Sequence, residues 1–141
     1  MVERDIVFAK VGIIQRCLRR IKDTTAFDPA CLDNLDKQDV FALNLQRAIQ
    51  AALDLAAHVV ASEGLGMPQE LKEHFTILER SGIVSSVLAD QMKKMVGFRN
   101  IAVHEYQELD VAVLKSILTK NLKDLEDFYT AVISHFNLAS E

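Results

Sequence analysis

The feature that most restricts the fold of this chain is a repeat of apolar residues at spacings of three and four. A half-buried β-strand would instead show apolar residues at every second position, and no segment does so. The sequence therefore predicts an all-α protein. Spacing of this kind puts the residues on one face of a helix, and the cleanest such stripe joins Val111, Leu114, Leu118, Leu122, Leu125, Tyr129, Val132 and Phe136.

Residues that commonly begin or end helices separate this stripe from four others, so about five helices are expected. Asp36 with Asp39 resembles a helix-start box for the second helix, which should be the most buried. Further boundary signals are Pro68 in the first turn of a short third helix, Ser85 or Ser86 before the fourth, His104 near its end, and Asp110 before the fifth.

The chain has 141 residues, enough for one domain with a substantial core, and we expect a single domain over residues 1–141. Only 5 glycines and 2 prolines occur, which favours long elements joined by few turns. The expected architecture is an up-and-down bundle of about five helices, in which the last two long helices flank the motif described below.

Three features bear on the compartment. The longest uncharged apolar stretch, around AAHVVA, is too short to span a bilayer. Charged residues at positions 3–5 precede any apolar run, so no secretory signal is visible. Cys17 and Cys31 are too few for a disulfide framework. We therefore expect a cytoplasmic protein that does not contact a membrane.

The net charge of −4 argues against a general electrostatic attraction to nucleic acid. Basic residues nevertheless gather near the end of the first predicted helix and within the fourth. Such clusters are either solvated helix faces or local patches that bind a polyanion, and the sequence leaves both interpretations open. They consist of Arg16, Arg19, Arg20, Lys22, Lys93, Lys94 and Arg99.

The segment MVGFRNIAVHEY, residues 95–106, places polar side chains in an apolar helix. At about 100° per residue, with Leu88 at zero, Arg99 lies at about +20°, in the middle of the apolar stripe. Asn100 at about +120° and His104 at about +160° lie at its edge and beyond. An unpaired guanidinium in a core costs several kcal/mol. Arg99 must therefore pair with a carboxylate, or face a cleft or a subunit interface.

Arg99 and His104 lie about 140° apart on an ideal helix, so a straight helix does not direct both at one group. The helix can loosen after Gly97 or unwind near His104, or two copies of the motif can face each other across a dimer axis. Tyr106 is exposed beside the histidine if the helix ends before it. If the motif instead has only a structural role, His104 is an ordinary helix-end residue and Tyr106 is a half-buried aromatic residue of a loop.

Arginine, asparagine and histidine together suit phosphate chemistry without a metal. Histidine moves a proton near neutral pH, arginine stabilises a phosphate that gains charge, and asparagine orients either group. Cleavage of RNA by internal attack of the 2′-hydroxyl has these requirements. No metal or cofactor is expected, because Glu70 and His74 lack further ligands and GLGM lacks the Gly-Lys of a phosphate-binding loop.

Followed by its amphipathic terminal helix, this motif resembles the HEPN superfamily, specifically the HepT toxins of bacterial HepT–MntA toxin–antitoxin pairs. The resemblance covers nearly the whole chain: a basic first helix, a long apolar second helix, the GLGMP turn, FTILERSGIVSS and FRNIAVHEYQELD. It implies a HEPN-like helical bundle and a metal-independent endoribonuclease. It also implies that the enzyme works as a homodimer, with paired Arg and His motifs lining a cleft for RNA.

The same resemblance implies roles for individual residues. Arg99 would stabilise the phosphate, His104 would transfer protons, and Asn100 would be the polar residue that commonly follows the arginine. Tyr106 would be adenylylated by an MntA-like minimal nucleotidyltransferase antitoxin, adding bulk and negative charge beside the site. Two other functions stay open, namely a non-catalytic helical interaction module and an acceptor subunit of a nucleotidyltransferase complex.

Overall fold

The computed structural model describes residues 1–138, apart from the side chain of Glu108. This part of the chain holds six α-helices, two short 3-10 helices and no strand, which confirms the all-α prediction. The elements are α1 (Arg4–Thr25), η1 (Pro29–Asp33), α2 (Leu35–Ser62), α3 (Glu73–Arg80), α4 (Ser86–His104), η2 (Tyr106–Glu108), α5 (Val111–Lys120) and α6 (Leu122–His135).

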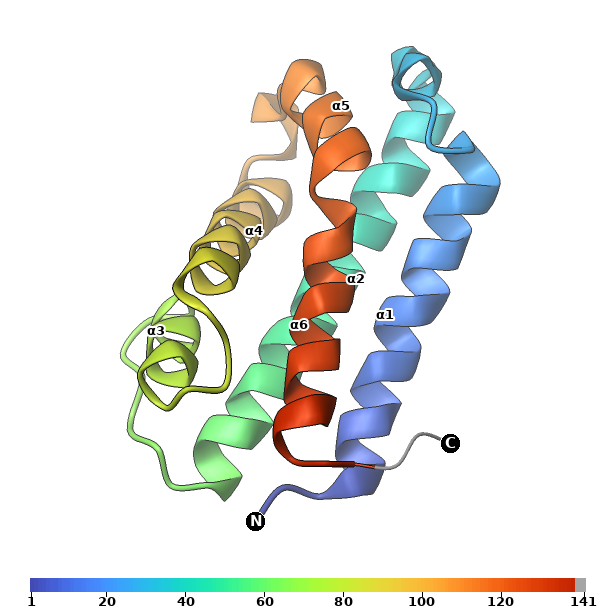
Figure 1. Ribbon diagram of the computed structural model, residues 1–141. Coiled ribbons are helices and arrows are strands. Elements are labelled where there is room, and N and C mark those ends of the chain that lie inside the picture. Colours follow the sequence, from blue (N-terminus) through green and yellow to red (C-terminus); the bar gives the residue numbers. More distant parts are fainter. Residues whose placement is uncertain (139–141) are drawn as a thin grey trace.

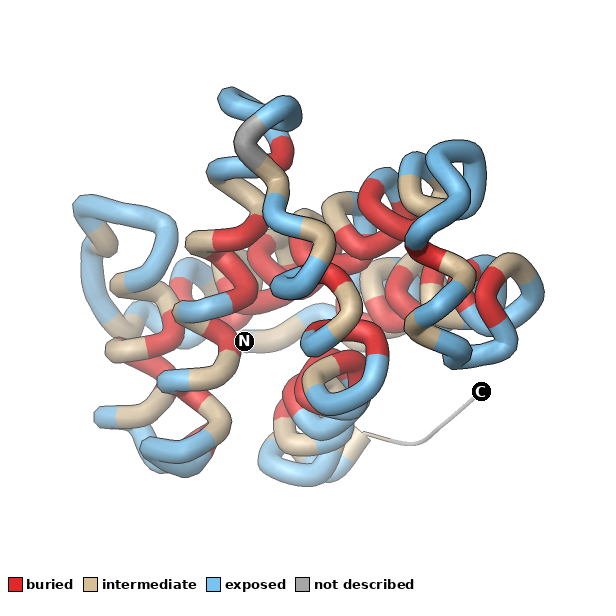
Figure 2. Tube along the Cα trace, turned by 90° about the horizontal axis from the view of Figure 1, so that it is seen from above, coloured by how far each residue is buried: buried red, intermediate tan, exposed pale blue. Residues whose placement is uncertain are grey.

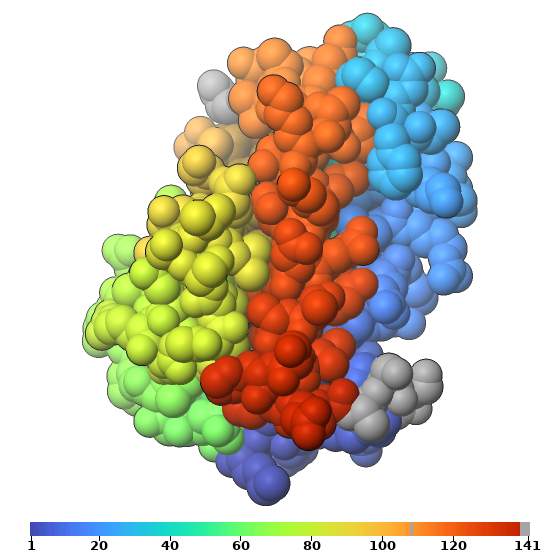
Figure 3. All heavy atoms as spheres, in the orientation of Figure 1, coloured from blue at the N-terminus to red at the C-terminus, as the bar shows by residue number. Residues whose placement is uncertain are grey.

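The long helices form an up-and-down bundle, as predicted. α1 rises from the N-terminus, α2 returns beside it, α4 rises again, and α5 and α6 lead back toward the starting end (Figure 1). α6 packs against α1, α2 and α4, and on the surface it lies between α1 and the α3–α4 side (Figure 3). Among the described helices, none is long and apolar enough to cross a membrane.

The buried residues lie on the sides of the helices that face one another (Figure 2), and they form one hydrophobic core. α2 contributes buried residues from Phe41 to Val60, because apolar side chains or alanines occupy most of its circumference. The rings of Phe75 on α3 and Phe128 on α6 pack edge to face, with 5.3 Å between their centroids. Such a pair contributes about 0.5–1.5 kcal/mol beyond its buried area. α2 and α4 pack against each other and against α6, and these contacts fix the two helices that carry Gln50 and Arg99.

Two predicted boundaries are confirmed by hydrogen bonds. The side chain of Ser85 accepts a hydrogen bond from the backbone N–H of Leu88 and caps α4. Asp110 accepts one from the N–H of Ala112 and caps α5. Both use a short polar side chain to satisfy an N–H group that has no partner within the helix.

The predicted starts of the second and third helices are wrong by a few residues. Asn34, rather than Asp36, caps α2 by accepting a hydrogen bond from the N–H of Lys37 at 3.1 Å. Asp39, expected to close a helix-start box, instead accepts a hydrogen bond from Tyr106. α3 begins at Glu73 and not near Pro68, because only its later apolar residues, such as Phe75, reach the core.

The predicted fifth helix is interrupted at Asn121, which separates α5 from α6. The N–H of Asp124 bonds to the carbonyl of Asn121 at 3.0 Å, and the Asn121 amide donates to the Asp124 carboxylate at 3.3 Å. Asparagine competes in this way with the regular helix ladder. The apolar stripe hides the break, because Leu118 and Leu122 keep a helical spacing across it and both are buried.

Candidate functional site

α4 carries the predicted motif and determines where its residues lie. The helix continues through Gly97 without a break and ends at His104, where the N–H of Glu105 bonds to the carbonyl of Ile101 at 2.7 Å. His104 is still part of the regular helix, so neither loosening after Gly97 nor unwinding near His104 turns its side chain toward Arg99 within one copy. Because the helix ends there, Tyr106 begins the separate turn η2 and is 41% exposed.

Arg99 lies on the face of α4 that meets α2, and it is only half-buried. Its Nε donates a hydrogen bond to Oε1 of Gln50 on α2 at 3.1 Å. Its Nη1 donates to Oδ1 of Asn100 at 3.1 Å. Both acceptors are neutral amide oxygens, and among the described side chains no carboxylate forms an ion pair with this guanidinium. The alternative in which a carboxylate binds Arg99 is therefore not observed.

The amide of Gln50 is held in one orientation by the next polar residue of α2. Its Nε2 donates to Oδ1 of Asp54 at 2.9 Å, and Oδ2 of Asp54 lies 3.2 Å from Nζ of Lys10 on α1. A carboxylate accepts hydrogen bonds and a guanidinium donates them, so Gln50 must turn its nitrogen to Asp54 and its oxygen to Arg99. Lys10, Asp54, Gln50 and Arg99 thus form one polar chain across three helices.

A neutral partner has a chemical consequence for Arg99. A carboxylate would cancel most of the positive charge on the guanidinium, whereas an amide oxygen orients it and leaves that charge to attract an anion. By the same reasoning, the side-chain oxygen of Asn100 faces the guanidinium, and its NH₂ group faces away. The two residues present N–H donors on an arginine that has kept its charge.

His104 and Tyr106 lie just beyond Arg99 at the exposed end of α4. The hydroxyl of Tyr106 donates a hydrogen bond to Oδ1 of Asp39 on α2. Burial of the phenol, its hydrogen bond to Asp39 and the negative charge of that residue together raise the pKa of Tyr106 to about 12. The phenol therefore keeps its proton at neutral pH.

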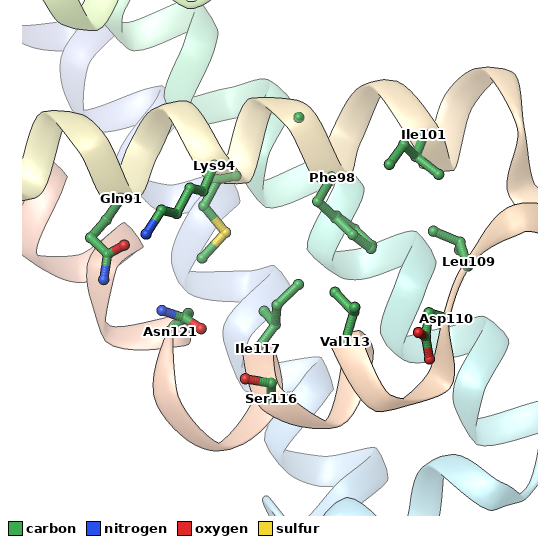
Figure 4. A pocket seen from close by; sticks show the side chains of 12 residues that line it. Gln91, Lys94, Phe98, Ile101, Leu109, Asp110, Val113, Ser116, Ile117 and Asn121 are labelled. Atoms are coloured by element: carbon green, nitrogen blue, oxygen red, sulfur yellow. The ribbon is translucent and has the colours of Figure 1, made fainter.

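The surface beside the motif is apolar. Ile101 and Val103 are 44% and 41% exposed on the last turns of α4. A groove of about 490 Å³ lies between α4 and α5, with Phe98 and Ile101 facing Val113 and Ile117 across it (Figure 4). None of the four motif residues lines this groove, so it is separate from the candidate site.

The described side chains include no group of three or more His, Cys, Asp or Glu residues placed to hold a metal ion. Glu70 precedes α3, and His74 bonds through Nδ1 to the carbonyl of Leu71 at 3.0 Å.

Gln50 and Asp39 were not predicted as partners of the motif, because both contact it from another helix. One signal for Gln50 was available: Gln50 and Asp54 are four residues apart and interrupt the most apolar stretch of the chain. Polar residues at this spacing share a helix face and interact with each other. For Asp39 no comparable signal existed, since an acidic residue near a helix start is common.

The fold and the motif together define the class. A helical bundle that carries arginine, asparagine and histidine near the solvent-exposed end of one helix has the architecture of the HEPN superfamily. The model of the family described as "Ribonuclease HepT-like" matches residues 14–132. The chain belongs to the HepT-like ribonuclease family, which confirms the predicted ribonuclease class.

Individual relatives agree with this assignment. The chain is 37% identical to the mRNA nuclease HepT of Shewanella oneidensis over 91% of this chain and 96% of that protein. It is 29% identical to the tRNA nuclease HepT of Aphanizomenon flos-aquae over 77% and 75% of the two chains. It is also similar to a solved structure of the tri-AMPylated Shewanella oneidensis HEPN toxin in complex with MNT antitoxin. That match has a TM-score of 0.87 and 36% identity over 94% of this chain and 99% of the other.

Proposed function

We propose that this chain is the toxin of a toxin–antitoxin pair and a metal-independent endoribonuclease, with Arg99, Asn100 and His104 as its catalytic residues. It acts in the cytoplasm as one HEPN-like domain. The observation that carries the proposal is the setting of Arg99, which lies on the inner face of α4 yet has neutral partners and remains half-exposed. Its relatives are nucleases of mRNA and tRNA, so the substrate class is RNA.

The reaction that these residues suit is internal transesterification. The 2′-oxygen of a ribose forms a bond to the adjacent phosphorus, the bond from phosphorus to the 5′-oxygen of the next nucleotide breaks, and a cyclic phosphate remains. Arg99 stabilises the additional charge on the phosphate oxygens, and the Asn100 NH₂ group donates to the same phosphate. His104 takes the proton from the 2′-hydroxyl or returns one to the leaving oxygen.

A homodimer supplies what one copy lacks. Removal of one proton and delivery of another occur on opposite sides of the phosphorus, and one imidazole cannot occupy both places at once. Two motifs that face each other provide two imidazoles and two guanidinium groups in a shared cleft. The exposed Ile101 and Val103 beside His104 support an interface at this end of α4, since burying them on association is favourable.

A minimal nucleotidyltransferase of the MntA type controls the activity of the toxin by modifying Tyr106. The Shewanella toxin is AMPylated in its complex with MNT antitoxin, and Tyr106 here offers an exposed hydroxyl two residues after His104. AMP on this oxygen adds a phosphodiester charge and a nucleoside beside the Arg–His pair. RNA phosphate is then repelled, and the cleft is filled.

Cleavage of total cellular RNA by the purified chain, with and without EDTA, tests the catalytic part. Arg99→Ala and His104→Ala should each abolish cleavage and growth arrest, and light scattering should show a dimer for both variants. Arg80→Ala and His135→Ala are matched controls, because both residues are exposed at the ends of other helices. Cleavage retained by a folded Arg99 or His104 variant, or lost with EDTA, contradicts the mechanism.

Intact mass after incubation with the partner nucleotidyltransferase, ATP and magnesium tests the control. Wild type and Tyr129→Phe should gain AMP, whereas Tyr106→Phe should stay unmodified and toxic. If wild type gains AMP but never cleaves RNA, the chain is an acceptor subunit and not a nuclease toxin. If Tyr106→Phe gains AMP as fast as wild type, another residue is the control point.

A further inference from the structure

Tyr106 follows the exposed end of α4 and has a hydrogen-bond partner on another helix. Its hydroxyl is held by Asp39, which lies 67 residues earlier in the chain, in the second turn of α2. The start of α2 and the segment after α4 lie at the same end of the bundle, which brings the two residues together (Figure 1). Both side chains are exposed, so a second protein can reach the pair without unfolding either helix.

The contact has a defined direction. A phenol has one proton to donate, and here it donates that proton to a carboxylate oxygen, so the lone pairs of the phenol oxygen are left for another partner. The raised pKa of Tyr106 means that almost none of the phenol is ionised at neutral pH. Its reaction with an electrophile therefore needs a base, and the Asp39 carboxylate is already hydrogen-bonded to the proton.

We propose that Asp39 is the positioning residue and proton acceptor for adenylylation of Tyr106, an inference that rests on the function proposed above. The phenol oxygen forms a bond to the α-phosphorus of ATP, and the bond from that phosphorus to the oxygen bridging to the β-phosphate breaks. Pyrophosphate leaves with the electron pair of the broken bond. The phenolic proton passes to Asp39 and from there to water.

The order of acidities supports this transfer. Before reaction the phenol holds its proton far more tightly than a carboxylic acid does. As the bond to phosphorus forms, the phenol oxygen loses electron density and its proton becomes strongly acidic. The proton then moves downhill to Asp39, at the stage of the reaction when it must leave.

Asp39 also distinguishes unmodified from modified tyrosine. The ester oxygen formed by adenylylation has no proton to donate, so the hydrogen bond to Asp39 is lost. The new phosphodiester anion then lies next to the Asp39 carboxylate, and the two negative charges repel each other. Asp39 therefore holds the unmodified side chain in place and releases the modified one.

The test compares full-length wild type with Asp39→Asn, which keeps an oxygen that accepts a hydrogen bond but cannot take up the proton. Asp36→Asn is the matched control, because it removes the same charge from an exposed position nearer the start of α2. Each chain is incubated with the partner nucleotidyltransferase, ATP and magnesium, and intact mass is followed over time. The initial rate should fall about a hundredfold in Asp39→Asn, as removal of a general base does, and stay near wild type in Asp36→Asn.

A second measurement needs no partner. The absorbance difference between wild type and Tyr106→Phe reports ionisation of this phenol. Its pKa should lie at about 12 in wild type. In Asp39→Asn it should fall toward the ordinary tyrosine value of about 10, and in Asp36→Asn it should not.

The outcomes separate the two proposals. If wild type gains AMP and Asp39→Asn gains it equally fast, the role of Asp39 is overturned while control through Tyr106 stands. If the phenol titrates alike in both chains, the contact on which the inference depends is refuted. If wild type gains no AMP, or gains it without Tyr106, the proposed control fails and this inference fails with it.

Discussion

Arg99 and Tyr106 lie on the same stretch of chain, and both are held by polar side chains of α2, but the partners differ in charge. Arg99 is oriented by the neutral amide of Gln50, whereas Tyr106 donates to the carboxylate of Asp39. The neutral acceptor leaves the guanidinium its full charge for an anion. The anionic acceptor keeps the proton on the phenol until it can leave. Side chains of α2 thus leave the Arg99 guanidinium charged and the Tyr106 phenol neutral.

The two contacts also differ in how firmly they are supported. Gln50 is fixed by Asp54, which in turn pairs with Lys10, so the orientation of Arg99 depends on three packed helices. Tyr106 follows the end of α4 in a short turn, and its hydroxyl donates a hydrogen bond to Asp39 at the exposed start of α2. This difference suits the proposed function, in which Arg99 meets every substrate and Tyr106 accepts AMP from another protein that must reach it.

The largest effect is expected for Arg99→Lys, which keeps the charge and removes the guanidinium. An ammonium on a flexible stem cannot bind Gln50 and Asn100 in the same way while it presents a second pair of donors to phosphate. Initial rates of RNA cleavage should fall about a hundred- to a thousandfold. A variant with more than half of the wild-type rate would mean that charge alone is sufficient and that the orientation of the side chain is unimportant.

A smaller loss, about tenfold, is expected for either Gln50→Glu or Gln50→Leu, for different reasons. The carboxylate of Gln50→Glu loses the hydrogen bond to Asp54 but still accepts from Arg99 and neutralises it, so the apparent KM for RNA should rise. Gln50→Leu removes the acceptor for Nε and lets the guanidinium move, so kcat should fall instead. The pair of variants thereby separates charge from orientation.

Gln46→Glu is the control for this pair, since it adds the same charge to a half-buried position one turn earlier on α2. Its kinetic constants should stay near those of wild type. Equal losses for Gln46→Glu and Gln50→Glu would show that any added negative charge on this helix has the same effect.

Much of the fold was predictable because local rules decide it. Apolar spacing gave the helices and their up-and-down order, and Ser85 and Asp110 act as the caps that their side chains suggest. The break at Asn121 was not predictable from spacing, because the apolar stripe continues across it. Asn34 was overlooked as a cap because Asp36 and Asp39 offered a competing start signal.

For the candidate site, the sequence indicated the residues of the motif but not their partners. The helical wheel put Arg99 in the buried face, which required a partner or a cleft without deciding between them. Gln50 and Asp39 lie 49 and 67 residues from the side chains they bind. Only the packing of α2 against α4 and the placement of η2 after α4 bring these positions together, and no periodicity within one helix encodes that.

A small gain in stability is expected for Gly97→Ala. This variant tests whether Arg99, two residues later, needs a flexible helix at Gly97. α4 is regular at this position, and an added Cβ would meet Nζ of Lys72 at 3.6 Å, an ordinary contact. Alanine in a helix interior is favoured over glycine by about 0.5–1 kcal/mol. Urea unfolding should show a gain of up to that size, with the rate of RNA cleavage unchanged. A large loss of cleavage without loss of stability would mean that the helix must bend at Gly97.

The smallest effect concerns the stability of the Tyr106 contact at high pH. The folded-state pKa of Tyr106 is raised to about 12. The unfolded chain has the ordinary value of about 10. Between these values the unfolded state loses the phenolic proton while the folded state keeps it, so unfolding becomes easier as pH rises. The contribution is fully present below about pH 10 and is lost as pH rises through about 12. Because the side chain is 41% exposed, solvent screens the contact and the effect is modest.

Tyr106→Phe removes the titrating group and serves as the reference. The difference in free energy of unfolding between wild type and Tyr106→Phe should shrink from about pH 10 to about pH 12 in urea titrations. In the Asp39→Asn background, the same difference should depend less on pH, because only burial of the phenol then raises the pKa of Tyr106, without the hydrogen bond and the negative charge of Asp39. A constant difference in the wild-type background would place Tyr106 away from Asp39 in solution. Arg99 would then still have a neutral partner on α2, but Tyr106 would have no anionic partner there to compare with it.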